Sequence, residues 1–132
     1  MIYLLDTNTC IQFLNGTSEA IRRQIEGLAA RDIALCSVVK AELVYGALKS
    51  QRPERNLARL RSFFSRFASM PFDDSAAEIY GDIRARLERA GTPIGPNDLY
   101  IAAIAKANGL TLVSHNAGEF GRVDGLRLED WE

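Results

Sequence analysis

Short runs of apolar residues alternate along the chain with longer stretches in which apolar residues recur every three or four positions. Apolar runs of this length that end abruptly at polar residues are typical of strands buried on both faces of a sheet. We expect such strands at residues 2–5, 33–36, 70–72, 111–113 and 126–128. The stretches between them have the spacing of helices with one buried face. Strands that alternate with helices predict an α/β fold, with a central, mostly parallel β-sheet flanked by helices on both faces.

The expected helices begin at polar residues or at proline. A serine, aspartate or asparagine side chain accepts hydrogen bonds from the free N–H groups of a first helical turn, and proline suits that turn because it lacks an N–H. We expect helices to begin at Ser18, Ser37, Pro53, Asp73, and at Asn97 or Asp98. Residues 6–8 have the composition of a turn, and residues 114–119 have that of a loop.

The length and composition fit one globular domain, residues 1–132. Of the 132 residues, 47% are hydrophobic and 25% are charged, which excludes a disordered or fibrous chain. No apolar stretch approaches the roughly 18 residues of a membrane span, and residues 2–5 lack the basic flank of a signal peptide. We therefore expect a cytoplasmic protein without a membrane partner. Cys10 and Cys36 lack the spacing of a redox motif, which favours reduced core thiols over a disulfide.

Acidic residues follow the ends of several expected strands. Asp6 comes directly after the first strand, and Glu119 lies shortly after the fourth. Glu42 lies in the helix after the second strand, and Asp98 lies behind a Gly/Pro turn. Because ligands of open α/β sheets bind outside the carboxyl ends of the strands, these four carboxylates can converge there. Clustered carboxylates repel one another unless cations intervene, and oxygen ligands without thiols suit Mg²⁺ or Mn²⁺, which serve phosphate chemistry.

Simpler interpretations of the same residues stay open. Asp6 also fits a turn or a helix cap, and Asp98 also fits a helix cap. An isolated glutamate such as Glu42 also fits the solvated surface of a helix. The single histidine, His115, excludes a ribonuclease mechanism with two histidines and leaves a Glu–His pair as a less favoured alternative. The sequence contains no serine-hydrolase elbow, phosphate-binding loop or zinc-ligand spacing.

Five segments, in order along nearly the whole chain, resemble PIN-domain ribonucleases, and specifically the VapC toxins of bacterial toxin–antitoxin pairs. The segments are residues 4–8 (LLDTN), 41–46 (AELVYG), 94–103 (IGPNDLYIAA), 112–116 (LVSHN) and 119–131 (EFGRVDGLRLEDW). A triplet such as DTN is unspecific alone, so the ordered set carries the resemblance.

The resemblance implies an acidic metal site in a single PIN domain. Asp6 and Asp98 would bind Mg²⁺ directly, and Mn²⁺ is the alternative ion. Glu42 would be a further ligand or the general base that activates water. The implied reaction is hydrolysis of an RNA phosphodiester that leaves a 5′-phosphate and a 3′-hydroxyl.

The resemblance also implies supporting roles around the metal site. Asn8 would hold Asp6 and the scissile phosphate, with the hydroxyls of Thr7 and Ser114 nearby. Many PIN domains have a fourth aspartate where this chain has Asn116. We expect Glu119 to supply the missing charge, and we count Asn116 and Glu119 among the catalytic candidates. Whether one or two metal ions bind stays open.

The relatives that this sequence resembles most have IGP and EDW in the same places, and they cut transfer RNA in the anticodon stem-loop, notably the initiator tRNA(fMet). The resemblance therefore implies a tRNA substrate, whose exposed loop suits the recognition of single-stranded RNA. A small VapB-like antitoxin would block the site and bind operator DNA, so the toxin would reach DNA only through its antitoxin. The resemblance also implies a homodimer, with higher assembly when the antitoxin is bound.

The distribution of charge matters more than its sum. The 16 basic and 17 acidic residues give a net charge of −1, which argues against a nucleic-acid binder that works through bulk charge. Between residues 49 and 66, however, six basic residues are opposed only by Glu54. A solvated surface is the alternative, but this cluster suits RNA phosphates or an antitoxin. The candidate contacts are Arg52, Arg55, Arg59 and, in a second cluster, Arg86.

Two other functions fit parts of the sequence. A phosphatase of the haloacid dehalogenase type would use Asp6 as a nucleophile, but it normally has a second aspartate at the place of Asn8. A non-catalytic PIN-like module would act only in antitoxin and operator binding. The presence of Asp6, Glu42 and Asp98 argues against such a module, whereas Asn116 favours it.

Overall fold

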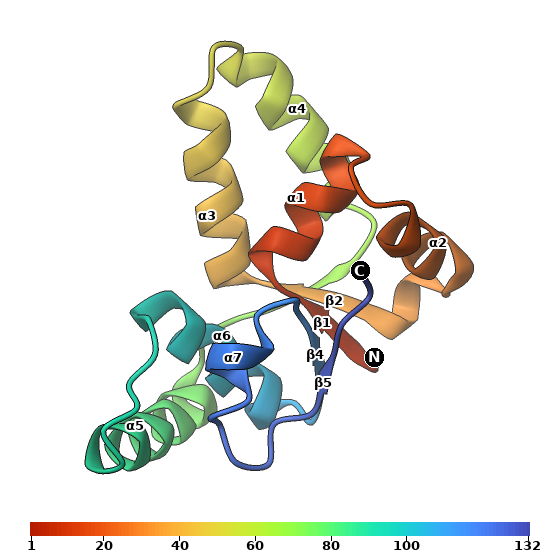
Figure 1. Ribbon diagram of the computed structural model, residues 1–132. Helices are drawn as coiled ribbons and strands as arrows, with labels where there is room; N and C mark the ends of the chain where they lie inside the picture. Colours follow the sequence, from red (N-terminus) through yellow and green to blue (C-terminus); the bar gives the residue numbers. More distant parts are fainter.

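The computed structural model describes residues 1–132, and a five-stranded, all-parallel sheet lies at its centre (Figure 1). The spatial order of the strands is β3-β2-β1-β4-β5. Their bounds are β1 (Tyr3–Leu5), β2 (Ile33–Cys36), β3 (Ala68–Met70), β4 (Thr111–Val113) and β5 (Leu128–Glu129). Because β1 lies between β2 and β4, Leu4 pairs with Ala34 on one side and with Leu112 on the other. These side chains are fully buried, as expected for strands covered on both faces.

Helices cover both faces of the sheet. They are α1 (Thr7–Asn15), α2 (Glu19–Gly27), α3 (Ser37–Leu48), α4 (Pro53–Phe64), α5 (Asp74–Arg89), α6 (Pro96–Ala107) and α7 (Ala117–Phe120), with a 3₁₀ turn at Ala30–Asp32. Right-handed crossovers in this strand order place α1 to α4 on one face and α5 to α7 on the other. Figure 1 shows these two groups above and below the sheet. The predicted α/β fold class is therefore confirmed.

The buried apolar residues form one cluster on both sides of the sheet. Five consecutive residues of α6, from Ile101 to Ala105, are buried, so this helix has no fully solvated side at its middle. The three alanines among them let the backbone of α6 lie close to its neighbours. None of the helices combines the length and the apolar character needed to cross a bilayer. Cys10 and Cys36 are buried and unpaired, as predicted.

The structure corrects several element boundaries. α1, which follows β1 directly, was not expected, because Asp6 and its neighbours have the composition of a turn. β3 is Ala68–Met70 rather than residues 70–72, and its side chains are exposed or half-buried, so backbone pairing with β2 sets its position. β5 is Leu128–Glu129 rather than residues 126–128, and the segment 114–119 includes the short helix α7.

Half of the predicted side-chain caps are present. Ser18 accepts a hydrogen bond from the N–H of Ile21 (3.3 Å), and Asp73 accepts one from the N–H of Ala76 (2.9 Å). Ser37 does not cap α3, because the cap position belongs to Cys36 and the Ser37 hydroxyl lies 3.4 Å from the carbonyl oxygen of Met70. Neither Asn97 nor Asp98 caps α6, because that helix begins at Pro96 and the cap position belongs to Gly95. The cap interpretation of Asp98 is therefore wrong.

Candidate active site

The candidate site lies where β1 and β4 end side by side. The chain leaves β1 toward α1 on one face and leaves β4 toward α7 on the other. Such a switch point is where open α/β sheets bind ligands. The N–H of Asp6 donates to the carbonyl oxygen of Val113 (3.1 Å), and the hydroxyl of Thr9 donates to the same oxygen (3.2 Å). These two bonds fix the start of α1 against the end of β4.

Asp6 is a buried carboxylate with one oxygen engaged and one free of hydrogen bonds. Its Oδ1 accepts a hydrogen bond from the N–H of Thr9 (2.9 Å), which makes Asp6 the cap of α1. Only 6% of the residue's surface is exposed. The cap interpretation of Asp6 is therefore confirmed, and it is compatible with a ligand role, because Oδ2 has no protein partner.

Asp98 lies in the first turn of α6 and is half-buried. The Nδ2 group of Asn116 donates to its Oδ2 over a long distance of 3.4 Å. Burial, the adjacent Glu119 and the charges of Asp6 and Glu42 together raise the pKa of Asp98 to about 7. The pKa of Glu119 is lowered because the protonated Asp98 carboxyl donates to it, so the two acids share a proton.

Asn116 and Glu119 are held on α7, at the end of β4. Asn116 caps this helix, and its N–H donates to the hydroxyl of the buried Ser114 (2.9 Å). The Nδ2 group of Asn116 also lies 3.4 Å from Oε2 of Glu119. Asn116 therefore bridges the two acids Asp98 and Glu119, and Ser114 orients Asn116 rather than the acids themselves.

A cavity of about 280 Å³ brings most of the predicted site residues together. Its polar lining consists of Asp6, Thr7, Asn8, Glu42, Asp98 and Asn116. These residues come from four helices, α1, α3, α6 and α7, or from the positions that cap them. Glu42 is half-buried and faces this cavity, so its interpretation as a fully solvated residue is wrong. Ser114 and Glu119 act from behind the lining, through Asn116 and Asp98.

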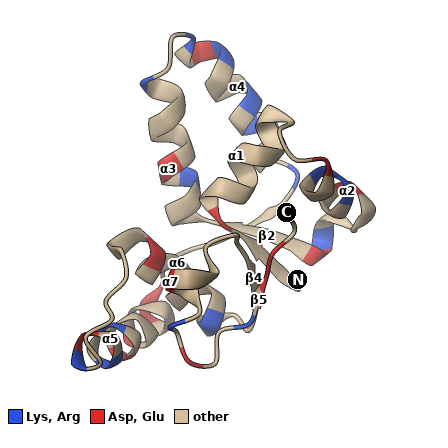
Figure 2. Ribbon diagram, in the orientation of Figure 1, with Lys and Arg blue, Asp and Glu red and all other residues tan.

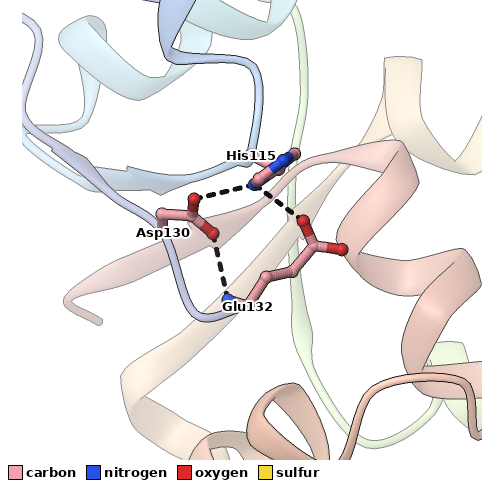
Figure 3. A group of neighbouring side chains, drawn as sticks. All are labelled: His115, Asp130 and Glu132. Carbon is pink, nitrogen blue, oxygen red and sulfur yellow. Dashed lines mark hydrogen bonds and ion pairs between the residues drawn. The ribbon is translucent and has the colours of Figure 1, made fainter.

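The residues of this cavity fit a hard divalent cation. The donors are carboxylate, amide and hydroxyl oxygens, without thiol or imidazole. The hydroxyl oxygen of Thr7 is buried and has no hydrogen-bond partner in the protein. The raised pKa of Asp98 also reflects acids that lack a neutralising positive group nearby. A second group of residues, His115, Asp130 and Glu132, lies outside this cavity, and its nitrogen and oxygen atoms lie within 4.8 Å of one another (Figure 3). As a group, the carboxylate oxygens of the cavity residues are farther apart than that.

The predicted arginines do not all approach the site. Arg52, Arg55 and Arg59 are exposed at the start of α4 and along it, and Lys and Arg predominate over acids there (Figure 2). Arg59 lines a groove of about 250 Å³ between α1, α3 and α4, which shares Ile11 and Glu42 with the acidic cavity. Arg86 instead pairs with Asp82 of its own helix, α5, at 3.0 Å and lines neither cavity.

Two residues at the site were missed from the sequence. Thr9 joins α1 to β4 through its hydroxyl. The apolar residues Cys10, Phe13 and Leu14 have helical spacing, and this spacing is the sequence signal that could have predicted α1 and so placed Thr9 on a helix. His115 was considered only as a catalytic base, whereas its Nδ1 pairs with Asp130 and Glu132. No sequence signal links residues 115 and 132, because the pairing depends on where β5 lies.

Comparison with known proteins identifies the family. The PIN domain family matches residues 3–126 of this chain. A tRNA(fMet)-specific endonuclease VapC from Salmonella typhimurium is 45% identical over 129 residues, which cover 98% of this chain and 97% of that protein. The ribonuclease VapC2 of Rickettsia felis is 42% identical over 133 residues, which cover 100% of this chain and 99% of that protein. A chain in the crystal structure of DNA-bound VapBC from Salmonella typhimurium matches this chain with a TM-score of 0.94 at 44% identity. The match covers 100% of this chain and 99% of that chain. This chain therefore belongs to the PIN-domain family and, within it, to the VapC ribonucleases.

Proposed function

We propose that this chain is the toxin of a toxin–antitoxin pair and cleaves RNA internally at the acidic cavity, with Mg²⁺ as cofactor and Mn²⁺ as the alternative. The observation that carries the proposal is the convergence of Asp6, Glu42 and Asp98 in one cavity at the switch point of the sheet. Burial, Glu119 and the charges of Asp6 and Glu42 together raise the pKa of Asp98, and a bound cation would relieve the repulsion among these acids. Hard cations held by carboxylates usually serve phosphate chemistry.

In this proposal Asp6 and Asp98 hold the cation directly. Asp6 can do so through Oδ2 while Oδ1 still caps α1, and Asp98 does so after losing its proton. Glu42 is a second ligand or the general base that accepts a proton from the attacking water on a carboxylate oxygen. When bound, the cation supplies the positive charge that activates water and neutralises charge developing on the phosphoryl oxygens.

The remaining residues of the site position these groups and the substrate. Asn8 and the Thr7 hydroxyl line the cavity beside Asp6, where each can donate a hydrogen bond to a phosphate oxygen. Asn116 holds Asp98 and Glu119 together, and Ser114 fixes Asn116. Glu119 supplies the negative charge that the neutral Asn116 lacks. The proposed products carry a 5′-phosphate and a 3′-hydroxyl, because water rather than the 2′-hydroxyl is the nucleophile.

The substrate and partners follow from the relatives. The Salmonella relative is named for tRNA(fMet), so we propose a tRNA, with the anticodon stem-loop of the initiator tRNA as the target. Solved structures of DNA-bound VapBC support the proposal of a VapB-like antitoxin for this chain, with operator DNA reached through the antitoxin. The proposal also includes a homodimer of the toxin, which the sequence resemblance implies. The buried free thiols of Cys10 and Cys36 suit a reducing compartment, so the proposed place of action is the cytoplasm.

Cleavage of initiator tRNA by the purified, antitoxin-free protein tests the proposal. Asp6→Asn and Asp98→Asn should each lower kcat by at least about a hundredfold, since even residues that only support metal ligands contribute ten- to a hundredfold. The matched control is Glu78→Gln on α5, because Glu78 is exposed and lies outside the cavity. Chelation should stop cleavage and Mg²⁺ should restore it, with circular dichroism unchanged throughout.

The outcomes separate the alternatives. Products that end in a cyclic phosphate would contradict the proposed mechanism, because they require the 2′-hydroxyl as nucleophile. Antitoxin binding without cleavage of any RNA would favour the non-catalytic module. An aspartyl-phosphate on Asp6 would favour the phosphatase, which neither the matching family nor the relatives support.

A further inference from the structure

Residues 130–132 lie across the end of β4 and against the start of the chain. Trp131 is buried, and its ring packs edge-on against Tyr3 of β1 with the ring centroids 5.1 Å apart. Its indole N–H donates to the side chain of Glu129 on β5 (3.1 Å). The segment 130–132 is therefore anchored to the sheet by Trp131, and its neighbours in the chain, Asp130 and Glu132, both contact His115.

Glu132 connects two segments that carry site residues. Its Oε1 accepts a hydrogen bond from the side-chain amide of Gln12 on α1 (2.5 Å). Its Oε2 lies 2.7 Å from Nδ1 of His115, which is also paired with Oδ2 of Asp130 at 2.8 Å (Figure 3). The N–H of Glu132 donates to the other oxygen of Asp130 (3.0 Å), which fixes the position of the two carboxylates around the imidazole.

Both ends of this connection lead to the acidic cavity. α1, which carries Gln12, begins at Asp6, and His115 lies between Ser114 and Asn116 in the chain. The other side-chain bond between α1 and this region is donated by the hydroxyl of Thr9, on α1, to the carbonyl oxygen of Val113, on β4. Thr9 bonds to Val113, at the strand itself, so it does not hold the residues that follow. The link through Glu132 is therefore what ties the segment 114–116 to α1.

The stability of the fold gives no reason for this link. The side chains of His115, Asp130 and Glu132 are 69%, 43% and 25% exposed, and exposed ion pairs contribute about 0 to 1 kcal/mol to folding. The ion pairs and the Gln12 bond account for the arrangement without a bound ion. Geometry is the quantity that the link controls, because Asn116 reaches Asp98 and Glu119 over 3.4 Å and a small displacement would break both contacts.

We propose that Glu132 is a positioning residue, which acts through His115 and Gln12 to hold Ser114 and Asn116 in register with Asp6 across the cavity. This inference rests on the proposed ribonuclease function for its kinetic consequences. Glu132 does not touch the cavity itself. Its loss therefore leaves the binding of RNA intact and misplaces the groups that act on the scissile phosphate.

Steady-state cleavage of initiator tRNA tests the kinetic part. Glu132→Ala should lower kcat by about tenfold, since misplacement of catalytic groups by 1 Å costs up to a hundredfold. KM for the tRNA should stay within about twofold. Glu78→Ala is the matched control, because it removes the same charge from an exposed position on α5 and should change neither constant. A rise in KM with unchanged kcat, or unchanged values of both, would overturn the proposal.

A double-mutant cycle tests whether the residues act as one link. His115→Ala should lower kcat as Glu132→Ala does, and the double variant should be no slower than the slower single variant, because one broken link cannot be broken again. Multiplied losses would show that Glu132 acts by another route. Equal melting temperatures for all variants, within about 2 °C, are expected, and a drop in kcat that follows lost stability would reduce Glu132 to a structural residue.

Amide hydrogen exchange tests the link without any cleavage. The N–H of Asn116, which is bonded to the Ser114 hydroxyl, should exchange faster in Glu132→Ala than in the wild type or in Glu78→Ala. Amides in the middle of α5 should be unaffected. Unchanged exchange at Asn116 would overturn the positioning role. A wild-type protein that cleaves no RNA would instead contradict the proposed function, and the exchange experiment would still decide the role of Glu132.

Discussion

Asp98 is held in a setting that changes its titration. The pKa of its carboxyl is raised to about 7 by burial, by Glu119 and by the charges of Asp6 and Glu42, from an ordinary value of 3.8. Between these two pH values the folded protein binds more protons than the unfolded chain. The free energy of unfolding of the metal-free protein therefore falls as the pH rises through this range. A divalent cation would replace the proton and favour the ionised form.

This titration predicts a pH-dependent melting temperature. In the presence of a chelator, the melting temperature of the wild type should fall between pH 5.5 and pH 8, and Asp98→Asn should flatten most of that fall. Added Mg²⁺ should raise the wild-type melting temperature more at pH 8 than at pH 6, because the proton competes for the site at the lower pH. Differential scanning calorimetry checks both expectations.

His115 provides the control for this pH profile. Asp130 and Glu132 raise the pKa of its imidazole, so its ion pairs stabilise the fold at low pH and are lost as the pH rises through the raised value. The loss of these ion pairs therefore lowers the free energy of unfolding as the pH rises, as the titration of Asp98 does. Exposed ion pairs, however, contribute little to that free energy. His115→Gln should therefore leave most of the fall in place. A flat profile in His115→Gln and a full fall in Asp98→Asn would contradict the assignment.

At the residue scale, chemistry was easier to predict than contacts. The position of Asp6, Glu42 and Asp98 after strands or in the helices that follow them was enough to expect their convergence, which the cavity shows. The bond between Thr9 and Val113 joins residues 104 positions apart and depends on the neighbouring placement of β1 and β4. Nothing local in the sequence encodes such a bond.

α1 shows how a helix can be hidden from sequence interpretation. It has only nine residues and starts inside the Asp-Thr-Asn triplet that favours a turn. Its C-terminus is capped by Gly16, whose backbone is left-handed at a φ of 65°, a conformation that glycine adopts without strain. The strand that was misplaced, β3, lies at an edge with exposed side chains, so hydrophobicity carries no information about its register.

The cap of α1 separates the structural role of Asp6 from its charge. Both Asp6→Asn and Asp6→Ala remove the negative charge and so relieve Asp98 equally. Only asparagine keeps an oxygen to accept the hydrogen bond from the N–H of Thr9. The free energy of unfolding of Asp6→Ala should therefore be about 1 kcal/mol lower than that of Asp6→Asn, which is the usual cost of losing a helix cap.

Urea denaturation in the presence of a chelator measures this difference. The comparison between the two variants is independent of the metal and of electrostatic repulsion, because both effects are shared. Equal midpoints for the two variants would mean that the N-terminus of α1 is held by its contacts with β4 rather than by its cap.

At the scale of the whole molecule, the order of elements was sufficient to predict the fold. Alternating strands and helices imply a parallel sheet, and the handedness of the crossovers then divides the helices between its faces. The pairing order of the strands, with β1 between β2 and β4, was not contained in that argument. It is this order that brings Asp6 beside Ser114 and sets α4 and α5 on opposite faces.

The net charge of −1 conceals a separation of acidic and basic residues between two parts of the molecule. The acids of the cavity lie at the switch point, whereas Arg52, Arg55 and Arg59 lie on or beside α4, at the far side of a groove that reaches the cavity through Ile11 and Glu42. None of these three arginines pairs with a carboxylate. Arg59 already donates to the backbone carbonyl of Leu14, so it holds α4 against α1. Arg52 and Arg55 are thus the cations most available to a polyanion.

Replacement of Arg52 and Arg55 by alanine should weaken the binding of tRNA without changing the cleavage step. Each arginine that contacts a phosphate contributes about 0.7 to 0.9 to the slope of log affinity against log salt, so the double variant should have a shallower slope and a higher KM with kcat retained. The matched control removes two charges from the opposite face, Arg84 and Arg89 of α5, and should leave the slope unchanged. Weaker antitoxin binding with unaltered tRNA binding would assign this face to the antitoxin instead. Because the two pairs change the net charge equally, any difference between them measures where the charge lies rather than how much there is.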